Sequence, residues 1–179
     1  MIKVAMTGAA GTKKSTVARE LAKAFDLVLV EEEAHYRLAH GLEMDNYAIA
    51  VRQLQREWAG MLQANMEDKR GFVSECSVRM AFVYSWILSA AEDIDEYCSI
   101  FDLLINFGYY DGWYDVELHC MMDGSKLEDN GVRYVGKKAE RVRKSIQRCR
   151  LSWDKPLYGT PEQKVTQAIG AVAGVLYGK

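Results

Sequence analysis

Proline, histidine and excess charge of one sign are all scarce in this chain of 179 residues. Its 2 prolines argue against Pro-rich linkers, and its net charge of -2 means that any nucleic-acid contact must come from a local basic patch. The 4 cysteines show no CxxC spacing, which predicts free thiols instead of a disulfide framework or a zinc site. No charge-free apolar run reaches the roughly 20 residues of a membrane-spanning helix. The N-terminus runs directly into a glycine-rich turn, without room for a signal peptide, so we expect a cytoplasmic protein with no membrane partner.

The composition suits a packed core. About half of the residues (49%) are apolar and 27% are charged, which is typical of a globular domain. The length fits one domain of ordinary size, and no repeat or low-complexity segment divides it. We therefore expect a single domain over residues 1–179.

Short apolar runs alternate with helical patterns along the chain. Strands are expected at Met1–Thr7, Leu27–Val30, Phe72–Glu75, Ser99–Phe107 and Trp153–Tyr158. Helices are expected from Ser15, over Asp45–Lys69, Met80–Ala91 and Lys137–Leu151, and from Thr160 onward. The segment 108–131, rich in Tyr, Gly and Asp, is predicted to be irregular. This alternation predicts an α/β fold with a mostly parallel sheet.

The strongest motif runs from Gly8 to Ser15 and fits the phosphate-binding pattern GxxxxGK(S/T), except that Lys13 replaces the second glycine. Small residues let backbone N–H groups surround phosphate oxygens, Lys14 would reach the β- and γ-phosphates as a catalytic residue, and Ser15 would offer its hydroxyl to Mg²⁺. The alternative is a glycine turn that binds nothing, but the strand before it and the amphipathic helix after it favour the phosphate site. The candidate nucleotide-binding residues are Gly8, Ala10, Gly11, Thr12, Lys13, Lys14, Ser15 and Thr16.

Four further segments resemble the P-loop nucleoside and nucleotide kinases, and above all small, phage-type thymidylate-kinase-like proteins and the kinase domains related to nicotinamide riboside kinase. Glu31–His35 resembles a motif P-E-x-A-R, and Ser74–Ser77 with Tyr84 resembles S-D-R-S…Y. Glu128–Arg133 is similar to the D-D-G-x-R entry to a lid, and Gly159–Lys164 to the loop that holds adenine. The resemblance implies a three-layer α/β/α fold, a five-stranded parallel sheet in the order 2-3-1-4-5 and a basic helical lid at about 129–150. It also implies that Gly159, Thr160 and Pro161 bind the nucleotide.

The chain departs from this pattern at the acceptor site. His35 and Cys76 replace two arginines that clamp phosphates or the acceptor, and Glu75 replaces an aspartate. Fixed guanidinium groups are the usual bidentate ligands of phosphate. Their loss argues against a monophosphate acceptor and favours a nucleoside or a hydroxyl on a modified base.

Two glutamates are the candidate catalytic carboxylates. Glu32 follows the second expected strand and would face the crevice where open α/β sheets bind ligands, as acceptor ligand or general base. The alternative is that the three adjacent glutamates form a solvated strand end. Glu75 is the last residue of the third expected strand and would bind Mg²⁺ together with Ser15, with an N-cap or a surface acid as its alternative.

The lid segment is strongly basic. Against one acid, Glu140, it carries Arg133, Lys137, Lys138, Arg141, Arg143, Lys144, Arg148 and Arg150. In a kinase this surface would close over the triphosphate, with Arg133 and Arg141 stabilising the transferred phosphoryl group. A nucleic-acid-binding strip and a merely solvated basic face are the alternatives.

Together these features predict an ATP- and Mg²⁺-dependent kinase that acts on a nucleoside or nucleoside monophosphate, with pyrimidines slightly favoured. Within the kinases, the alternative acceptor is a hydroxymethylated base in DNA. From another class, the alternative is a regulator that binds ATP without turning over an acceptor. A homodimer is left open.

Overall fold

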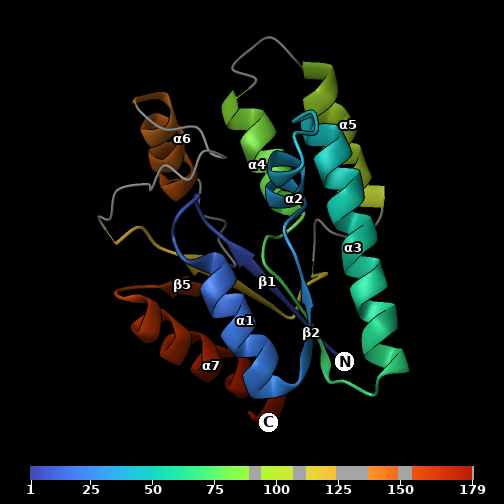
Figure 1. The fold of residues 1–179 in the computed structure, drawn as a ribbon, viewed down its shortest axis with the longest axis vertical. Coiled ribbons are helices and arrows are strands. Elements are labelled where there is room, and N and C mark those ends of the chain that lie inside the picture. Colours follow the sequence, from blue (N-terminus) through green and yellow to red (C-terminus); the bar gives the residue numbers. More distant parts are fainter. Residues whose placement is uncertain (89–93, 107–111, 124–136, 149–154, 179) are drawn as a thin grey trace.

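The structure is a computed structural model that describes residues 1–88, 94–106, 112–123, 137–148 and 155–178 (Figure 1). Within these ranges, no helix is both long enough and apolar enough to cross a membrane. The three cysteines in these ranges, Cys76, Cys98 and Cys120, are free thiols as expected.

Five parallel strands form one sheet in the order β2-β3-β1-β4-β5, which confirms the predicted order. The strands are β1 (Ile2–Thr7), β2 (Leu27–Val30), β3 (Gly71–Ser74), β4 (Val116–Cys120) and β5 (Lys155–Leu157). All residues of β3 and β4 are buried, because helices cover both faces of the sheet.

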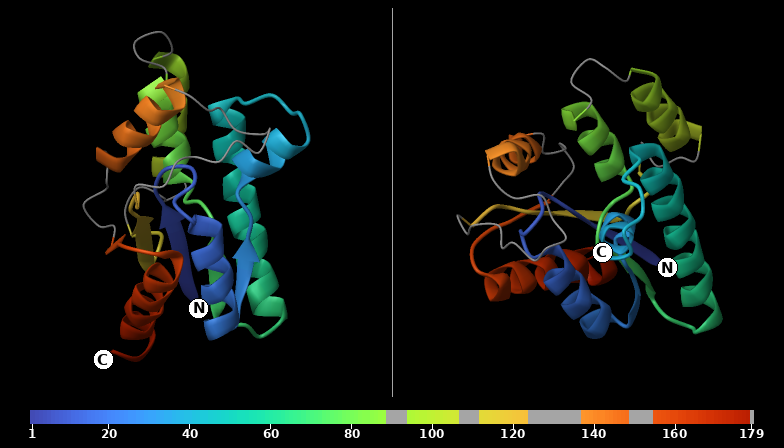
Figure 2. Two further views of the ribbon diagram at one scale, coloured as in Figure 1. Left: turned by 60° about the vertical axis from the view of Figure 1, so that its left-hand side comes forward. Right: turned by 45° about the horizontal axis from the view of Figure 1, so that its top comes forward.

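Helices on the two faces of the sheet complete three layers (Figures 1 and 2). Helices α1 (Lys14–Phe25) and α7 (Pro161–Tyr177) lie together on one face. The other face carries α3 (Asn46–Met66), with α4 (Arg79–Leu88) and α5 (Ile94–Asn106) beside it. The short α2 (Glu33–Ala39) follows β2, and α6 (Lys137–Arg148) lies above the ends of the strands.

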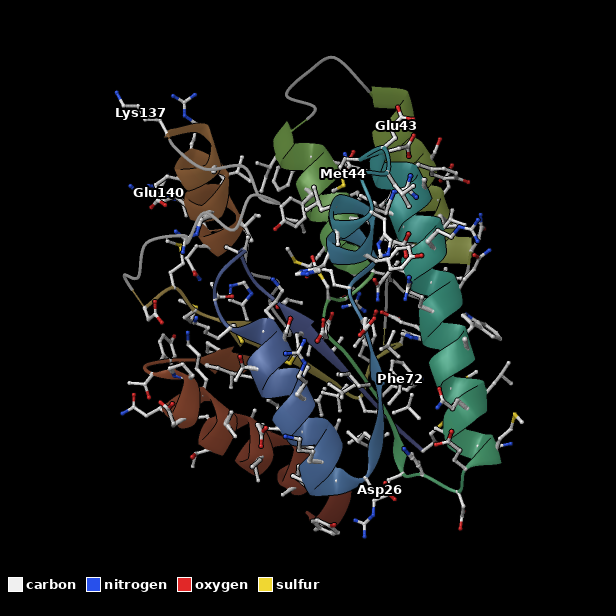
Figure 3. All side chains as sticks on the ribbon, in the orientation of Figure 1. Asp26, Glu43, Met44, Phe72, Lys137 and Glu140 are labelled. Atoms are coloured by element: carbon white, nitrogen blue, oxygen red, sulfur yellow. The ribbon has the colours of Figure 1, made fainter. Side chains whose placement is uncertain are left out.

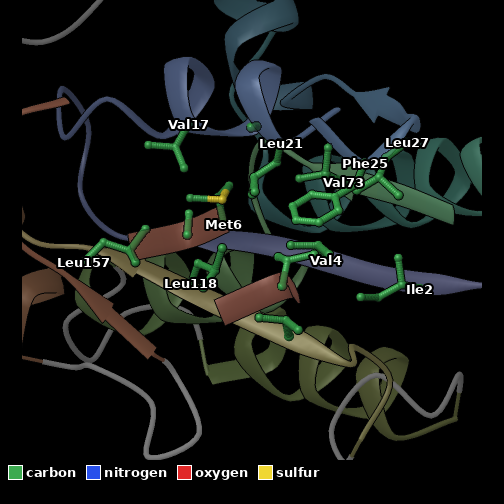
Figure 4. Close-up of a cluster of buried hydrophobic side chains, with 14 of the residues drawn as sticks. Ile2, Val4, Met6, Val17, Leu21, Phe25, Leu27, Val73, Leu118 and Leu157 are labelled. Atoms are coloured by element: carbon green, nitrogen blue, oxygen red, sulfur yellow. The ribbon is translucent and has the colours of Figure 1, made fainter. Parts of the chain in front are cut away.

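The core under α1 and α7 is built from alternate residues of the strands (Figure 4). Val4 and Met6 of β1 point toward Val17 and Leu21, which are one turn apart on α1. All four side chains are fully buried. This spacing is why the apolar pattern after Ser15 predicts a helix that packs on the sheet.

The opposite core lies between the sheet and α3 (Figure 3). Phe72 of β3 is fully buried there against the apolar side of α3. Gly60 lets α3 approach the sheet closely, because a Cβ atom at this position would lie 2.5 Å from Cγ2 of Val30.

The predicted fourth strand is wrong. Residues 99–106 belong to helix α5, where Ile100 and Leu104 are buried one turn apart and Ile105 is exposed. The fourth strand is β4, inside the segment predicted to be irregular. Six of the nine residues at 99–107 are apolar, which favoured a buried strand over a helix, and the buried polar residues Glu117 and His119 hide the true strand.

Candidate active site

Three strand ends meet at one edge of the sheet. The segment from Gly8 to Ser15, called the P-loop from here on, follows β1. Glu31 and Glu32 follow β2, and Glu75 follows β3. Helices α2 and α6 lie at this same edge (Figures 1 and 2). In open α/β sheets this edge is where ligands bind.

Two glycines with positive φ angles shape the backbone of the P-loop. Gly8 and Gly11 adopt φ values of 117° and 77°, and a Cβ atom on Gly8 would lie 2.6 Å from the carbonyl oxygen of Cys120. The Thr12 hydroxyl donates to the Ala9 carbonyl at 2.9 Å and ties the two halves of the loop together. The loop thus keeps its shape while its next residues begin α1.

Lys13 takes up the conformation for which the pattern has a glycine. Its φ and ψ are 71° and 25°, in the left-handed region. The other non-glycine residues with positive φ in the described ranges are Asp26 and Asp68, a residue type that tolerates this region better than lysine. The strain at Lys13 is about 1 kcal/mol.

Lys14, the predicted phosphate-binding lysine, is buried at the mouth of the loop. Its Nζ donates to the carbonyl oxygens of Gly8 at 3.0 Å and Ala9 at 3.1 Å. Burial acts to lower the pKa of Lys14, but the Glu32 carboxylate and smaller charges outweigh it and raise the pKa above its usual value. The ammonium group of Lys14 is therefore charged at neutral pH.

A cleft of about 210 Å³ opens beside the P-loop and brings together three of the predicted residues. Ser15 lines it from α1, Glu32 from the end of β2 and Glu75 from the end of β3. The other lining residues are Arg19, Glu31, His35, Tyr36, Ala39 and His40. The cleft thus adjoins the first turn of α1, directly after the P-loop.

The three adjacent glutamates do not form one solvated strand end. Glu31 is exposed and Glu32 is half-buried in the cleft, whereas Glu33 is buried. Glu33 forms a hydrogen-bonded ion pair of 2.6 Å with Arg56 of α3 and lies 3.7 Å from Arg37. Glu33 therefore anchors α2, whereas Glu31 and Glu32 both line the cleft.

Glu75 fits the predicted role of a Mg²⁺ ligand. Its side chain is 6% exposed, and its Oε1 atom is buried without a hydrogen-bond partner, 3.5 Å from Arg19 Nη2. Within the described ranges, no group of three His, Cys, Asp or Glu residues could hold a metal alone. Mg²⁺ in phosphoryl-transfer sites needs no such group, since one or two protein oxygens and the phosphates suffice.

Cys76 lies behind this cleft as a neutral thiol. Burial and then the Glu32 carboxylate raise its pKa well above the usual value. Neither a thiol nor a thiolate carries a positive charge, so Cys76 cannot supply the charge that an arginine provides at this position of the kinase pattern. His35 lines the cleft at the other substituted position.

The predicted adenine loop begins α7. Thr160 is the N-cap residue and forms a capping box with Gln163, and Pro161 is the first helical residue. Gly159 precedes them at a φ of 86°. Lys164, in the first turn, donates to the carbonyl oxygen of Thr12 at 3.3 Å and so connects this segment to the P-loop.

On helix α6, a residue that sequence reasoning did not select contacts the P-loop. Arg143 is buried, and its Nε donates to the carbonyl oxygen of Ala10 at 3.1 Å while Nη1 pairs with Glu140 at 3.0 Å. Arg141 lies on the exposed side of α6, and Figure 3 shows Lys137 at the outer end of this helix. Arg133 lies outside the described residues. A signal for Arg143 is its position three residues before Ile146, on the buried side of α6.

The remaining candidate nucleotide-binding residues lie in the P-loop and at the start of α1. Ala10 and Ser15 are half-buried and Thr16 is exposed on the first turn of α1. Of the aromatic residues between 107 and 114, those described serve packing: Trp113 stacks on Trp58, and Tyr114 is buried. They do not line the cleft beside the P-loop.

A buried hydrogen-bond network supports the cleft from behind. Gln53 of α3 accepts from the backbone N–H of Glu33 at 2.8 Å and donates to the Ser74 hydroxyl at 3.0 Å. It thereby joins the segments that carry Glu32 and Glu75. Glu57, one turn further along α3, is fully buried and accepts from the Tyr114 hydroxyl at 2.9 and 2.7 Å.

Glu57 predicts a pH-dependent stability. Burial raises its pKa from 4.5 to about 8, against the hydrogen bonds that lower it. The folded state therefore binds this proton more tightly than the unfolded state. Its stabilising contribution is complete below about pH 4.5, falls as the pH rises and is absent above about pH 8.

We expect the free energy of unfolding to fall between pH 5 and pH 8.5 by an amount on the order of a few kcal/mol. Glu57→Gln should remove most of this slope and be the more stable protein at pH 8.5. Urea denaturation at several pH values measures the pH dependence of the free energy of unfolding, with the exposed Glu67→Gln as control. An unchanged slope in Glu57→Gln would show that other groups cause the pH dependence.

Comparison with solved structures shows which known fold this arrangement matches. The chain is similar to deoxyadenosine kinase from M. mycoides with bound dATP, with a TM-score of 0.62 and 11% identity over 96% of this chain and 99% of that chain. It is also similar to the NadR protein in complex with NR, with a TM-score of 0.65 and 17% identity over 97% of this chain and 49% of that chain. No family model and no curated protein matches the sequence. The chain therefore has the P-loop nucleoside-kinase-like fold that the motifs predict.

Proposed function

We propose that this protein is a nucleoside kinase that transfers the γ-phosphoryl group of ATP, with Mg²⁺, to a hydroxyl group of a nucleoside. The observation that carries this proposal is the cleft in which Ser15 of the P-loop lies beside Glu32 and Glu75. It offers space for an acceptor next to the place where the γ-phosphate would lie on the P-loop. The structural neighbours named deoxyadenosine kinase and NadR in complex with NR support an acceptor of this class.

The charges around the cleft favour a neutral acceptor. Three carboxylates line it, those of Glu31, Glu32 and Glu75, whereas Arg19 is the single lysine or arginine among the described lining residues. Arg19 is 59% exposed and already lies 3.5 Å from Glu75. A monophosphate would bring about two negative charges into this acidic surrounding. A nucleoside brings none, and among nucleosides we expect pyrimidines to be slightly favoured.

Each residue then has a defined role in the transfer. The P-loop N–H groups and Lys14 hold the β- and γ-phosphates, and Glu32 accepts the proton of the nucleoside hydroxyl. The hydroxyl oxygen forms a bond to the γ-phosphorus, the bond from that phosphorus to the β–γ bridging oxygen breaks, and ADP leaves.

Ser15 and Glu75 would hold Mg²⁺, which neutralises phosphate charge when bound. Arg143 would turn from the Ala10 carbonyl to the transferred group, and Arg141 and Arg133 stay predicted lid contacts.

A transfer assay with γ-labelled ATP tests the proposal. The acceptors are a panel of nucleosides and the matching monophosphates, with and without Mg²⁺. We expect kcat/KM for the best nucleoside to exceed that for its monophosphate by at least about tenfold, since one repulsive charge contact costs more than 1 kcal/mol in a partly buried site. A monophosphate preference would overturn the nucleoside assignment. ATP binding without any product would favour a regulator.

A second candidate is a kinase that acts on a hydroxymethylated base in DNA. The observation in its favour is a row of exposed basic residues on one side of α6: Lys137, Arg141, Lys144 and Arg148. Such a row could hold a phosphate backbone. Labelled hydroxymethylated DNA, together with DNA binding that weakens steeply with salt, would favour this candidate over the free nucleoside.

A further inference from the structure

Lys164 is the less expected of two buried lysines. Within the described ranges, the buried lysines are Lys14 and Lys164. Both donate to carbonyl oxygens of the P-loop. Lys14 belongs to the phosphate motif. Lys164 comes from α7, 152 positions from Thr12, and its side chain is 0% exposed. Lysine is almost never fully buried without a partner.

The bond from Lys164 acts on the strained part of the loop. The Thr12 carbonyl belongs to the peptide group that precedes Lys13, so its orientation is tied to the φ angle of Lys13. The Lys13 carbonyl accepts from the backbone N–H of Val17 at 3.1 Å, which holds the peptide that sets ψ. Both peptide groups beside the left-handed residue are thus held by hydrogen bonds. Strained residues persist where the surrounding structure fixes them in this way.

The two bonds differ in origin. An N-cap carbonyl normally accepts the first hydrogen bond of its helix, so the Val17 contact is common to helix starts. The Lys164 contact needs a buried ammonium group, which Asp123 Oδ2 at 3.8 Å helps to balance. A glycine at position 13 would reach a φ of 71° without such support.

We propose that Lys164 is a positioning residue that holds the Thr12–Lys13 peptide in the left-handed geometry and so compensates for the glycine that the P-loop lacks. The role deepens the proposed function, since it concerns the nucleotide half of the same site. It predicts energetic coupling between positions 164 and 13. The effect of a substitution at position 164 should therefore depend on which residue stands at position 13.

A double-mutant cycle tests this coupling. The proteins are the wild type, Lys164→Met, Lys13→Gly and the double variant, with the exposed Lys23→Met as a control for lysine loss. The readouts are the Kd of a non-hydrolysable ATP analogue with Mg²⁺ and the free energy of unfolding without nucleotide. We expect Lys164→Met to weaken nucleotide binding about tenfold in the wild-type background and no more than about twofold in the Lys13→Gly background.

Each outcome decides the matter. Equal losses of affinity in the two backgrounds would mean that Lys164 acts on the nucleotide or the core directly, and would overturn the proposal. So would no loss in either background, or unfolding of Lys164→Met in both. Recovery of folding or of affinity by Lys13→Gly supports it. Because no acceptor is used, coupling in stability without nucleotide binding would leave this role intact while removing the kinase assignment.

Discussion

Lys14→Ala is expected to lower the rate of phosphoryl transfer by about 10²–10³-fold or more while the protein stays folded. Lys14 carries a buried charge whose pKa the neighbouring Glu32 helps to raise, so the wild-type ammonium is fully charged at the phosphate site. Without nucleotide it donates to the carbonyl oxygens of Gly8 and Ala9. When phosphates bind, we expect it to exchange these carbonyls for the more strongly attracting phosphate oxygens.

The control for this variant is Lys23→Ala on the same helix. Lys23 is exposed and pairs with Glu20 at 2.9 Å, so its loss should cost little stability and no activity. Circular dichroism and thermal unfolding establish that both variants are folded, and the transfer assay compares their rates. A folded Lys14→Ala protein with wild-type activity would remove the P-loop assignment.

Glu32→Gln is expected to lower kcat by about 10²–10⁴-fold with a much smaller effect on ATP affinity. The amide keeps the size of the side chain but cannot accept the hydroxyl proton of the nucleoside. ATP affinity is measured separately, because Glu32 also favours the charged form of Lys14.

Glu43→Gln, an exposed change of the same kind, is the matched control for this second variant. Its rate should stay at the wild-type value, which excludes a general effect of removing one negative charge. If Glu32→Gln also keeps the wild-type kcat, Glu32 is not the general base and serves at most to bind the acceptor.

Local signals made much of the fold and the P-loop predictable. Gly8, Gly11, Lys14 and Ser15 all lie within one short segment, so their spacing is visible in the sequence itself. The strand before this segment and the helix after it each show an apolar pattern of their own. The carboxyl-end rule for α/β sheets likewise predicts that Glu32 and Glu75 lie at one edge of the sheet, because each lies within two residues of the end of a strand. The strand predicted at Ser99–Phe107 is wrong because six of its nine residues are apolar, which favoured a buried strand, although the polar residues Ser99, Asp102 and Asn106 recur at the three- and four-residue spacing of a helix.

Long-range contacts were not predictable in the same way. Arg143 and Lys164 reach the P-loop from segments more than a hundred positions away. A weak signal exists for Lys164, which lies four and eight residues before the buried Ala168 and Val172 on the same side of α7. A lysine at such a position more often buries only the aliphatic part of its side chain, while the ammonium group reaches solvent. Only the packing of α7 beside α1 shows that its ammonium group ends on the P-loop.

The most direct measurement is single-turnover transfer from γ-labelled ATP to the best nucleoside of the panel, with Mg²⁺ and an excess of protein. We predict that the label appears on the nucleoside hydroxyl at a rate that Lys14→Ala and Glu32→Gln each reduce at least a hundredfold, about the loss of one catalytic group. Label that remains on ATP, or that is released as free phosphate at the same rate with and without nucleoside, would contradict a kinase.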